Sequence, residues 1–257
     1  MQPTSQSNIY VEAFRVMVAN IGIAIGCAAA ATAVGVFADY LEKPSISMVP
    51  EVIIWAALAF AAHSSVLLGV SGIRSMANSR DFGGFWMRSL GLTFLFAVPA
   101  VIAAFVMAFA FSRSQTLSIG MGSAAGITVG LCIFSLLGTW LPAVVAGGDR
   151  SLSAAFARGA YSFRYVASRL LAGPVLFITG VLFLLGLIAI ATPQSGAAAA
   201  SSPVDFGALD LALRFAAQVS NAYAVVITAV ILSRAYMMIE SYEPDVTSQQ
   251  GMVMQRP

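Results

Sequence analysis

Charged residues are scarce in this chain. Lys, Arg, Asp and Glu make up 9% of its 257 residues, whereas an average soluble protein has about 25%. Apolar residues account for 59% of the chain, and this composition excludes an ordinary soluble fold. The net charge of +2 is too small to indicate nucleic-acid binding, so we predict no nucleic-acid partner.

Motifs that carry chemistry are missing as well. The chain has no phosphate-binding P-loop, no H-E-x-x-H zinc motif and no pair of acids spaced for general acid and base catalysis. Its longest apolar stretches contain no carboxylate, which argues against proton relays and most ion-coupled carriers. We therefore predict that the protein is not an enzyme and that it uses no cofactor.

Cysteine and histidine are nearly absent. Cys27, Cys132 and the one histidine, His63, all lie near the middle of apolar stretches, where no disulfide framework is implied. A soft metal could bind these three side chains if they converged. No C-x-x-C spacing supports such a site, so we predict no metal site and keep an intramembrane metal or redox centre as an alternative.

A few polar residues nevertheless interrupt the apolar stretches. An ionisable residue at mid-membrane depth is by default a functional candidate, which makes His63 the first residue to test. The last apolar stretch carries polar residues of its own, for which interhelical hydrogen bonding is the simpler role and a substrate pathway the alternative. The candidate intramembrane polar site consists of His63, Ser64, Gln218 and Asn221.

Long uncharged apolar stretches dominate what is present. Each is long enough to cross a bilayer, which takes about 20 apolar residues. We predict an all-α, polytopic transmembrane helix bundle, with one domain over residues 1–242 and a disordered tail over 243–257. The six predicted spans cover residues 16–37, 52–73, 89–111, 119–141, 170–191 and 215–233.

Basic residues are distributed unevenly between the connections. Short loops rich in Lys and Arg stay on the cytoplasmic side of a membrane. With both termini cytoplasmic, ten of the 13 basic residues fall inside. The remaining three, Lys43, Arg113 and Arg214, fall outside. We therefore predict a multi-pass protein of the inner membrane with both termini in the cytoplasm.

A separate helix is predicted between the fourth and fifth spans. Pro142 is expected to end the fourth span, Gly147 and Gly148 break the chain, and Ser151 can cap a new helix. Over residues 151–169, large apolar side chains gather on one face and polar ones on the opposite face. The apolar face consists of Leu152, Phe156, Phe163, Val166 and Leu170.

That pattern is typical of an amphipathic helix that lies in the membrane interface. Its arginines could bind the phosphates of lipid head groups through paired hydrogen bonds. Simple anchoring under the positive-inside rule is the alternative. The predicted head-group contacts are Arg150, Arg158 and Arg169.

Glycines recur at intervals of four residues in two spans. Gly22 and Gly26 lie in the first span, and Gly122, Gly126 and Gly130 lie in the fourth. Such small-residue stripes allow helix backbones to approach closely in a membrane. We predict that these glycines mediate helix packing, either inside the chain or with a second copy or a partner helix.

The order of these features resembles a known family. A Glu12-Ala13-Phe14-Arg15 segment precedes the first span, Pro142 is followed by small residues, and a Ser-x-x-x-Ala-Phe helix begins at Ser151. This order is similar to that of the glycerophosphodiester phosphodiesterase membrane-domain superfamily, which comprises bacterial six-helix inner-membrane proteins. The resemblance extends from Tyr10 to about Tyr236, and it implies a bacterial inner-membrane protein with six helices.

The chain departs from that family at one point. Members often carry an acidic residue a few positions after the proline, where this chain has Ala146, Gly147 and Gly148 before Asp149. The phosphodiesterase activity belongs to a separate soluble domain in fused members, so the resemblance implies no such activity here.

The leading functional hypothesis follows from the missing chemistry and the glycine stripes. We expect a non-enzymatic integral membrane protein that packs with, or scaffolds, components of the cell envelope. Its expected partners are membrane lipids and either a second copy of the chain or another membrane protein. A transporter of lipids or small apolar solutes is the first alternative, and the intramembrane metal or redox protein is the second.

Overall fold

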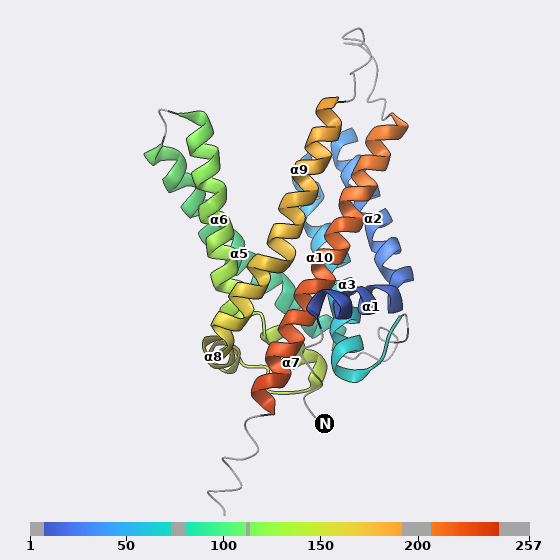
Figure 1. Cartoon of the computed structure of the whole chain (residues 1–257), viewed down its shortest axis with the longest axis vertical. Helices are drawn as coiled ribbons and strands as arrows, with labels where there is room; N and C mark the ends of the chain where they lie inside the picture. Colours follow the sequence, from blue (N-terminus) through green and yellow to red (C-terminus); the bar gives the residue numbers. More distant parts are fainter. Residues whose placement is uncertain (1–7, 73, 75–80, 112–113, 192–206, 242–257) are drawn as a thin grey trace, which may run out of the picture. The chain divides into compact units, whose positions relative to one another are not determined.

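The computed structural model describes residues 8–72, 74, 81–111, 114–191 and 207–241 (Figure 1). All the regular elements in these residues are helices, so the predicted all-α bundle is confirmed. Six helical stretches are long and apolar enough to cross a membrane. They are Ile21–Tyr40, Met48–Leu68, Phe82–Ala110, Leu117–Ala146, Leu152–Ile188 and Ala208–Glu240.

The helices form two compact units. Unit 1 consists of Met1–Phe82 and Leu171–Val230, and unit 2 consists of Gly83–Leu170 and Ile231–Pro257. The single domain predicted over 1–242 stays a prediction. The tail predicted over 243–257 lies outside the described residues, as do 192–206 of the connection before the last helix.

Unit 1 is built from the N-terminal helices, α9 and most of α10. Helix α2 packs against α3, and both contribute buried small residues, such as Ala24 and Ala28 from α2 and Ala61 from α3. Small side chains allow helices to approach closely where lipid provides no hydrophobic driving force. The elements are α1 (Ile9–Ala19), α2 (Ile21–Tyr40), a 3-10 turn (Pro44–Ile46), α3 (Met48–Leu68), a π turn (Leu171–Val175), α9 (Leu176–Ala191) and α10 (Ala208–Glu240).

The first predicted span, 16–37, is divided in the structure. Helix α1 ends at Ala19 and α2 begins at Ile21, and α1 lies across the direction of α2 (Figure 1). The side chain of Asn8 caps α1 by accepting a hydrogen bond from the Tyr10 amide at 3.1 Å. The prediction was wrong at this point because the two helices are separated at Asn20. Asn20 carries no charge, so it does not interrupt the uncharged stretch from which the span was predicted.

Unit 2 contains an antiparallel pair of helices, α5 (Phe82–Ala110) and α6 (Gln115–Leu137). The glycine stripe of α6 faces α5. A Cβ atom on Gly122 would lie 3.5 Å from the backbone of Ala104, one on Gly126 would lie 4.0 Å from Ala100, and one on Gly130 would overlap the ring of Phe96. Each step of one turn along α6 is therefore matched by one turn back along α5.

A short helix, α7 (Trp140–Ala146), follows α6. Pro142 was expected to end the fourth span, but α6 already ends at Leu137 and Pro142 lies in the first turn of α7. The first turn accepts proline because its amide would have no partner within the helix. Gly147 ends α7 with a φ of 74°, a left-handed conformation that favours glycine.

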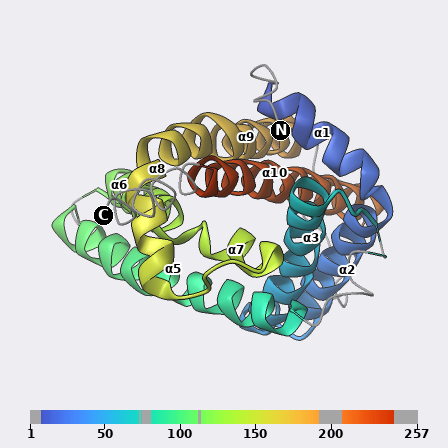
Figure 2. The ribbon, with the colours of Figure 1, turned by 90° about the horizontal axis from the view of Figure 1, so that it is seen from below.

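The helix predicted over 151–169 is α8 (Leu152–Leu170), which continues along the chain into the π turn and α9 without a break. Its location in the membrane interface stays a prediction. Ser151 caps it, since the Ala154 amide donates to the Ser151 hydroxyl at 3.2 Å. Helix α8 contacts α6 extensively and crosses it near the end of α6 (Figures 1 and 2). The crossing is close, because a Cβ atom on Gly159 would collide with the backbone of Leu136.

Candidate functional sites

The predicted intramembrane polar site lies in unit 1. His63 and Ser64 are buried near the end of α3, with exposed fractions of 1% and 2%, whereas Gln218 and Asn221 are half-buried on α10. His63 has an interaction partner, whereas the hydroxyl oxygen of Ser64 has no hydrogen-bond partner among the described residues. Burial fits an internal role for His63 and Ser64.

The cysteines are placed differently from each other. Cys27 is buried in α2, where its thiol donates to the Ile54 carbonyl at 3.4 Å, whereas Cys132 is exposed on α6. In the part of the chain that the structure describes, no group of three or more His, Cys, Asp and Glu residues could hold a metal ion. The metal alternative therefore has no geometric support.

Two of the five predicted packing glycines have no such contact. A Cβ atom on Gly22 or Gly26 would meet no described atom within 4 Å. These glycines lie on an exposed face of α2, because the buried face carries Ala24, Cys27 and Ala28 instead. Within the described residues, the predicted packing contacts are seen at Gly122, Gly126 and Gly130 of α6. Packing of Gly22 and Gly26 against a second copy or a partner helix stays a prediction.

Asn20 forms a polar junction that the sequence analysis missed. Its amide nitrogen donates to the Val16 carbonyl and to the Ser65 hydroxyl, both at 2.8 Å, and its amide oxygen accepts from the Gly72 amide at 2.8 Å. Asn20 is 1% exposed. It joins α1 and α2 to the end of α3. An asparagine inside an otherwise apolar run was the available signal.

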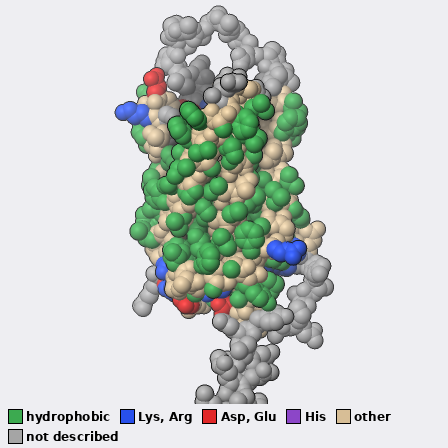
Figure 3. Space-filling view, turned by 90° about the vertical axis from the view of Figure 1, so that its left-hand side faces the viewer, with side chains coloured by type: hydrophobic (Ala, Val, Ile, Leu, Met, Phe, Trp, Pro, Cys, Tyr) green, Lys and Arg blue, Asp and Glu red, His purple; other side chains and the backbone are tan. Residues whose placement is uncertain are grey.

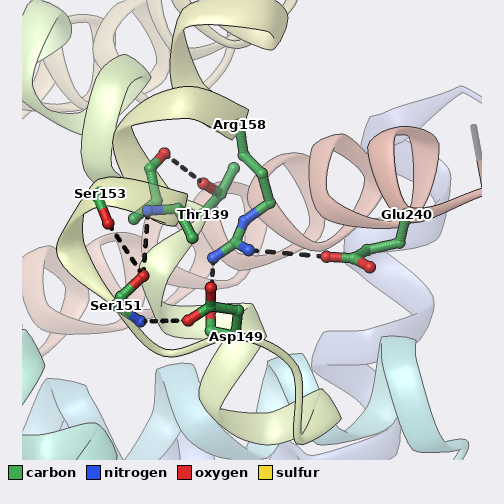
Figure 4. Close-up of polar contacts among 8 residues, drawn as sticks. Thr139, Asp149, Ser151, Ser153, Arg158 and Glu240 are labelled. Atoms are coloured by element: carbon green, nitrogen blue, oxygen red, sulfur yellow. Dashed lines mark hydrogen bonds and ion pairs between the residues drawn. The ribbon is translucent and has the colours of Figure 1, made fainter. Parts of the chain in front are cut away.

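The most elaborate polar cluster lies in unit 2, around Arg158 of α8. The guanidinium donates to the Asp149 carbonyl at 2.9 Å and lies 3.7 Å from a carboxylate oxygen of Glu240, at the end of α10. Figure 4 shows the side chain extending from α8 toward both partners. The guanidinium carbon also lies 5.4 Å from the centre of the Tyr236 ring, a cation–π arrangement.

Arg158 was predicted to contact lipid head groups, and the structure places it elsewhere. Its exposed fraction is 7%, and its Nε atom has no hydrogen-bond partner in the described part of the chain. The buried face of α8 contains Ala155, Arg158, Gly159 and Ser162, because small residues allow α6 to approach. The head-group role of Arg158 is therefore corrected to that of an internal anchor.

The other two predicted head-group arginines differ from Arg158. Arg169 is exposed and stacks on Tyr165 at 4.5 Å, so its head-group role stays a prediction. Arg150 is half-buried, and its backbone carbonyl accepts from the Trp140 indole at 2.7 Å. Its head-group role also stays a prediction.

The turn before α8 is held by its own polar groups. The Ser151 amide donates to the Asp149 carboxylate at 2.8 Å, and hydrogen bonds from the backbone and side chain of Ser151 keep the pKa of Asp149 below its usual value. A carboxylate at a helix N-terminus also complements the helix dipole. The cluster therefore anchors the start of α8, and the described partners of Arg158 supply no nucleophile activated by a base.

Helix length and composition define the class of protein. The chain is a multi-pass, α-helical integral membrane protein. Comparison with protein-family models, curated proteins and solved structures finds no match for this chain. The resemblance to the glycerophosphodiester phosphodiesterase membrane-domain superfamily therefore stays a prediction.

Proposed function

We propose that this protein is a non-enzymatic membrane scaffold, whose helix α5 packs against a second copy of the chain or another membrane protein. The observation that supports this proposal is the exposure of α5. Only 6% of its most apolar stretch is buried, compared with 61% for α10. One face of α5 packs on the glycines of α6 at Phe96, Ala100 and Ala104, and the rest of its surface is open to another helix or to lipid.

The open surface extends along the second half of α5. Its buried residues, Phe85 and Leu92, both lie in the first half. Further along, Phe105 and Phe109 are 73% and 79% exposed. Figure 3 shows one face of the molecule, with hydrophobic side chains across its middle and charged ones toward its ends. Aromatic and small residues together offer a surface for van der Waals packing with another helix.

Site-specific photocrosslinking in native membranes tests this proposal. A photoreactive residue at Phe105 should give protein adducts, identified by mass spectrometry as a second copy or a distinct membrane protein. The matched control is Phe183 of α9, which is 68% exposed and belongs to unit 1. Lipid adducts alone at both positions would refute the scaffold function, because α5 would then be an ordinary lipid-facing helix.

A second candidate function is transport of lipids or small apolar solutes. The observation in its favour is the buried pair His63 and Ser64, in the same unit as the half-buried Gln218 and Asn221. Polar residues inside a membrane bundle mark substrate pathways in other proteins. Reconstituted protein that moved a labelled lipid across vesicles, and lost this activity in His63→Ala, would favour transport over scaffolding.

The location belongs to the same proposal. We infer a bacterial inner membrane, with both termini in the cytoplasm, from the family resemblance and from the distribution of arginines. The expected partners are membrane lipids and a second copy or another membrane protein, with no role for nucleic acid.

A further inference from the structure

An apolar groove runs along the surface of unit 1 between α2 and the start of α10, which lie side by side (Figure 1). Its volume is about 400 Å³, within the range of about 300 to 1,000 Å³ that ligand sites occupy. Small side chains at successive turns of α2 form one wall, and two larger ones on α10 form the other. The lining residues are Ala29, Thr32, Ala33, Val36, Leu211 and Phe215.

The groove has the shape and surroundings of a site for a hydrocarbon chain. Ala29 and Val36 are seven residues apart on α2, which corresponds to about 10 Å along the helix axis. The one hydroxyl in the lining, that of Thr32, donates to the Ala28 carbonyl within its own helix at 2.8 Å. The lining therefore presents an apolar surface to the membrane.

One end of the groove carries charge. Asp39 follows Val36 by one helical turn, and Arg214 immediately precedes Phe215. Arg214 bridges two carboxylates, with an Nη atom 2.5 Å from Asp39 and its Nε atom 2.7 Å from Asp210. Helix α2 ends at Tyr40, so this cluster lies at the boundary between membrane and water.

The cluster has one negative charge more than its guanidinium neutralises. Asp39 and Asp210 are 41% and 47% exposed, so their remaining oxygen lone pairs are accessible. The next charged residues along the turn, Glu42 and Lys43, cancel each other. A carboxylate pair of this kind attracts a cation with several N–H donors, and it repels a group that is only anionic.

We propose that the groove binds one acyl chain of a phospholipid whose head group carries a primary ammonium, such as phosphatidylethanolamine. The chain lies along α2 between Ala29 and Val36, and the ammonium donates hydrogen bonds to Asp39 and Asp210. A quaternary choline head group has no N–H to donate, and a glycerol head group leaves the lipid with a net negative charge. The site therefore selects among lipids by head-group chemistry.

Native mass spectrometry of the full chain, solubilised with an equal mixture of dioleoyl phosphatidylethanolamine, phosphatidylcholine and phosphatidylglycerol, tests the selection. The wild-type protein should retain the ethanolamine lipid over either other lipid by roughly fivefold, the order expected for one charge-assisted hydrogen bond at a partly exposed site. Equal retention of the three lipids, or a preference for the glycerol lipid, would overturn the proposal.

Two pairs of variants locate the site. Ala33→Phe fills the groove and should abolish selective retention, whereas Ala30→Phe places the same ring on an exposed part of α2 outside the groove and should not. Asp210→Asn removes the excess charge and should lower the preference over choline to about twofold or less. Its control, Glu51→Gln on α3, removes a carboxylate that does not line the groove.

Identical behaviour within either pair would contradict the assignment to this groove. If Ala33→Phe does not fold, the comparison of Asp210→Asn with Glu51→Gln still tests the proposed lipid site. The scaffold function rests on α5 in unit 2, so the crosslinking and lipid-retention experiments can fail independently of each other.

Discussion

The Asn20 side chain donates two hydrogen bonds and accepts one at the junction of α1, α2 and α3. A buried polar group that loses its partner costs more than the hydrogen bond contributes. Asn20→Ala would leave the Gly72 amide and the Ser65 hydroxyl without this partner. We expect the free energy of unfolding to fall by about 2 kcal/mol.

Reversible unfolding in mixed detergent micelles measures this loss. The control is Asn221→Ala, which removes a half-buried amide from α10 and should cost less than about 1 kcal/mol. Equal stability of the wild-type protein and Asn20→Ala would show that the junction does not hold the helices together.

Gly159 is the residue at which a single methyl group matters most. A Cβ atom there would collide with the backbone of Leu136, and backbone cannot rotate away as a side chain can. Gly159→Ala should therefore force α6 and α8 apart and destabilise the protein by about 2–3 kcal/mol. Gly26→Ala, on the open face of α2, should be neutral or stabilise by up to about 1 kcal/mol. Unfolding midpoints that shift equally in both variants would disprove the close crossing.

Helix α8 shows what a pattern predicts well at the scale of an element. Its existence and bounds followed from breakers, a cap and amphipathic periodicity, and they agree with the structure to within one residue at each end. The buried face was predicted only in part. Val166 and Leu170 of the predicted apolar face are buried, whereas Leu152 and Phe156 are 47% and 53% exposed. In a membrane, large apolar side chains can face lipid. The buried face of α8 therefore also contains the small residues Ala155, Gly159 and Ser162, which allow close helix packing.

Arg158 joins α8 to the end of α10, and this link is testable. Arg158→Met retains much of the side-chain volume but removes the hydrogen bond to Asp149 and the contacts with Glu240 and Tyr236. Because the guanidinium is buried, we expect a loss of about 2 kcal/mol. Hydrogen exchange should also rise at the start of α8 and the end of α10.

The control for this link is Arg164→Met, which removes an exposed arginine from the same helix and should change stability by less than about 0.5 kcal/mol. A larger effect at Arg164 than at Arg158 would instead indicate that α8 depends on its contacts with lipid head groups. Glu240 is 37% exposed and 3.7 Å away, so Glu240→Gln should have a small effect.

At the scale of the whole molecule, apolar run length predicted the six spans but not all their bounds. The second span was predicted over 52–73, while α3 ends at Leu68, because hydropathy continues beyond the end of the helix at Gly69. The sixth was predicted over 215–233, whereas α10 extends over Ala208–Glu240. Hydropathy indicates which segments lipid can surround, whereas a helix ends where its terminal backbone groups find other hydrogen-bond partners. The two boundaries therefore need not coincide. The partners of Asn20 and Arg158 depend on tertiary contacts that no local pattern encodes.

The distribution of arginines predicts the orientation of the whole chain, and two exposed positions can test it. Lys43 lies in the turn after α2 and Ser153 in the first turn of α8. In a variant with Cys27 and Cys132 replaced by alanine, we introduce Lys43→Cys or Ser153→Cys. In intact spheroplasts, a membrane-impermeant maleimide should label Lys43→Cys, and it should label Ser153→Cys only after lysis. We expect this result because the positive-inside rule predicts that the arginine-rich α8 lies in the cytoplasm. The reverse labelling would invert the orientation, and labelling of both positions before lysis would contradict the assigned number of crossings between them.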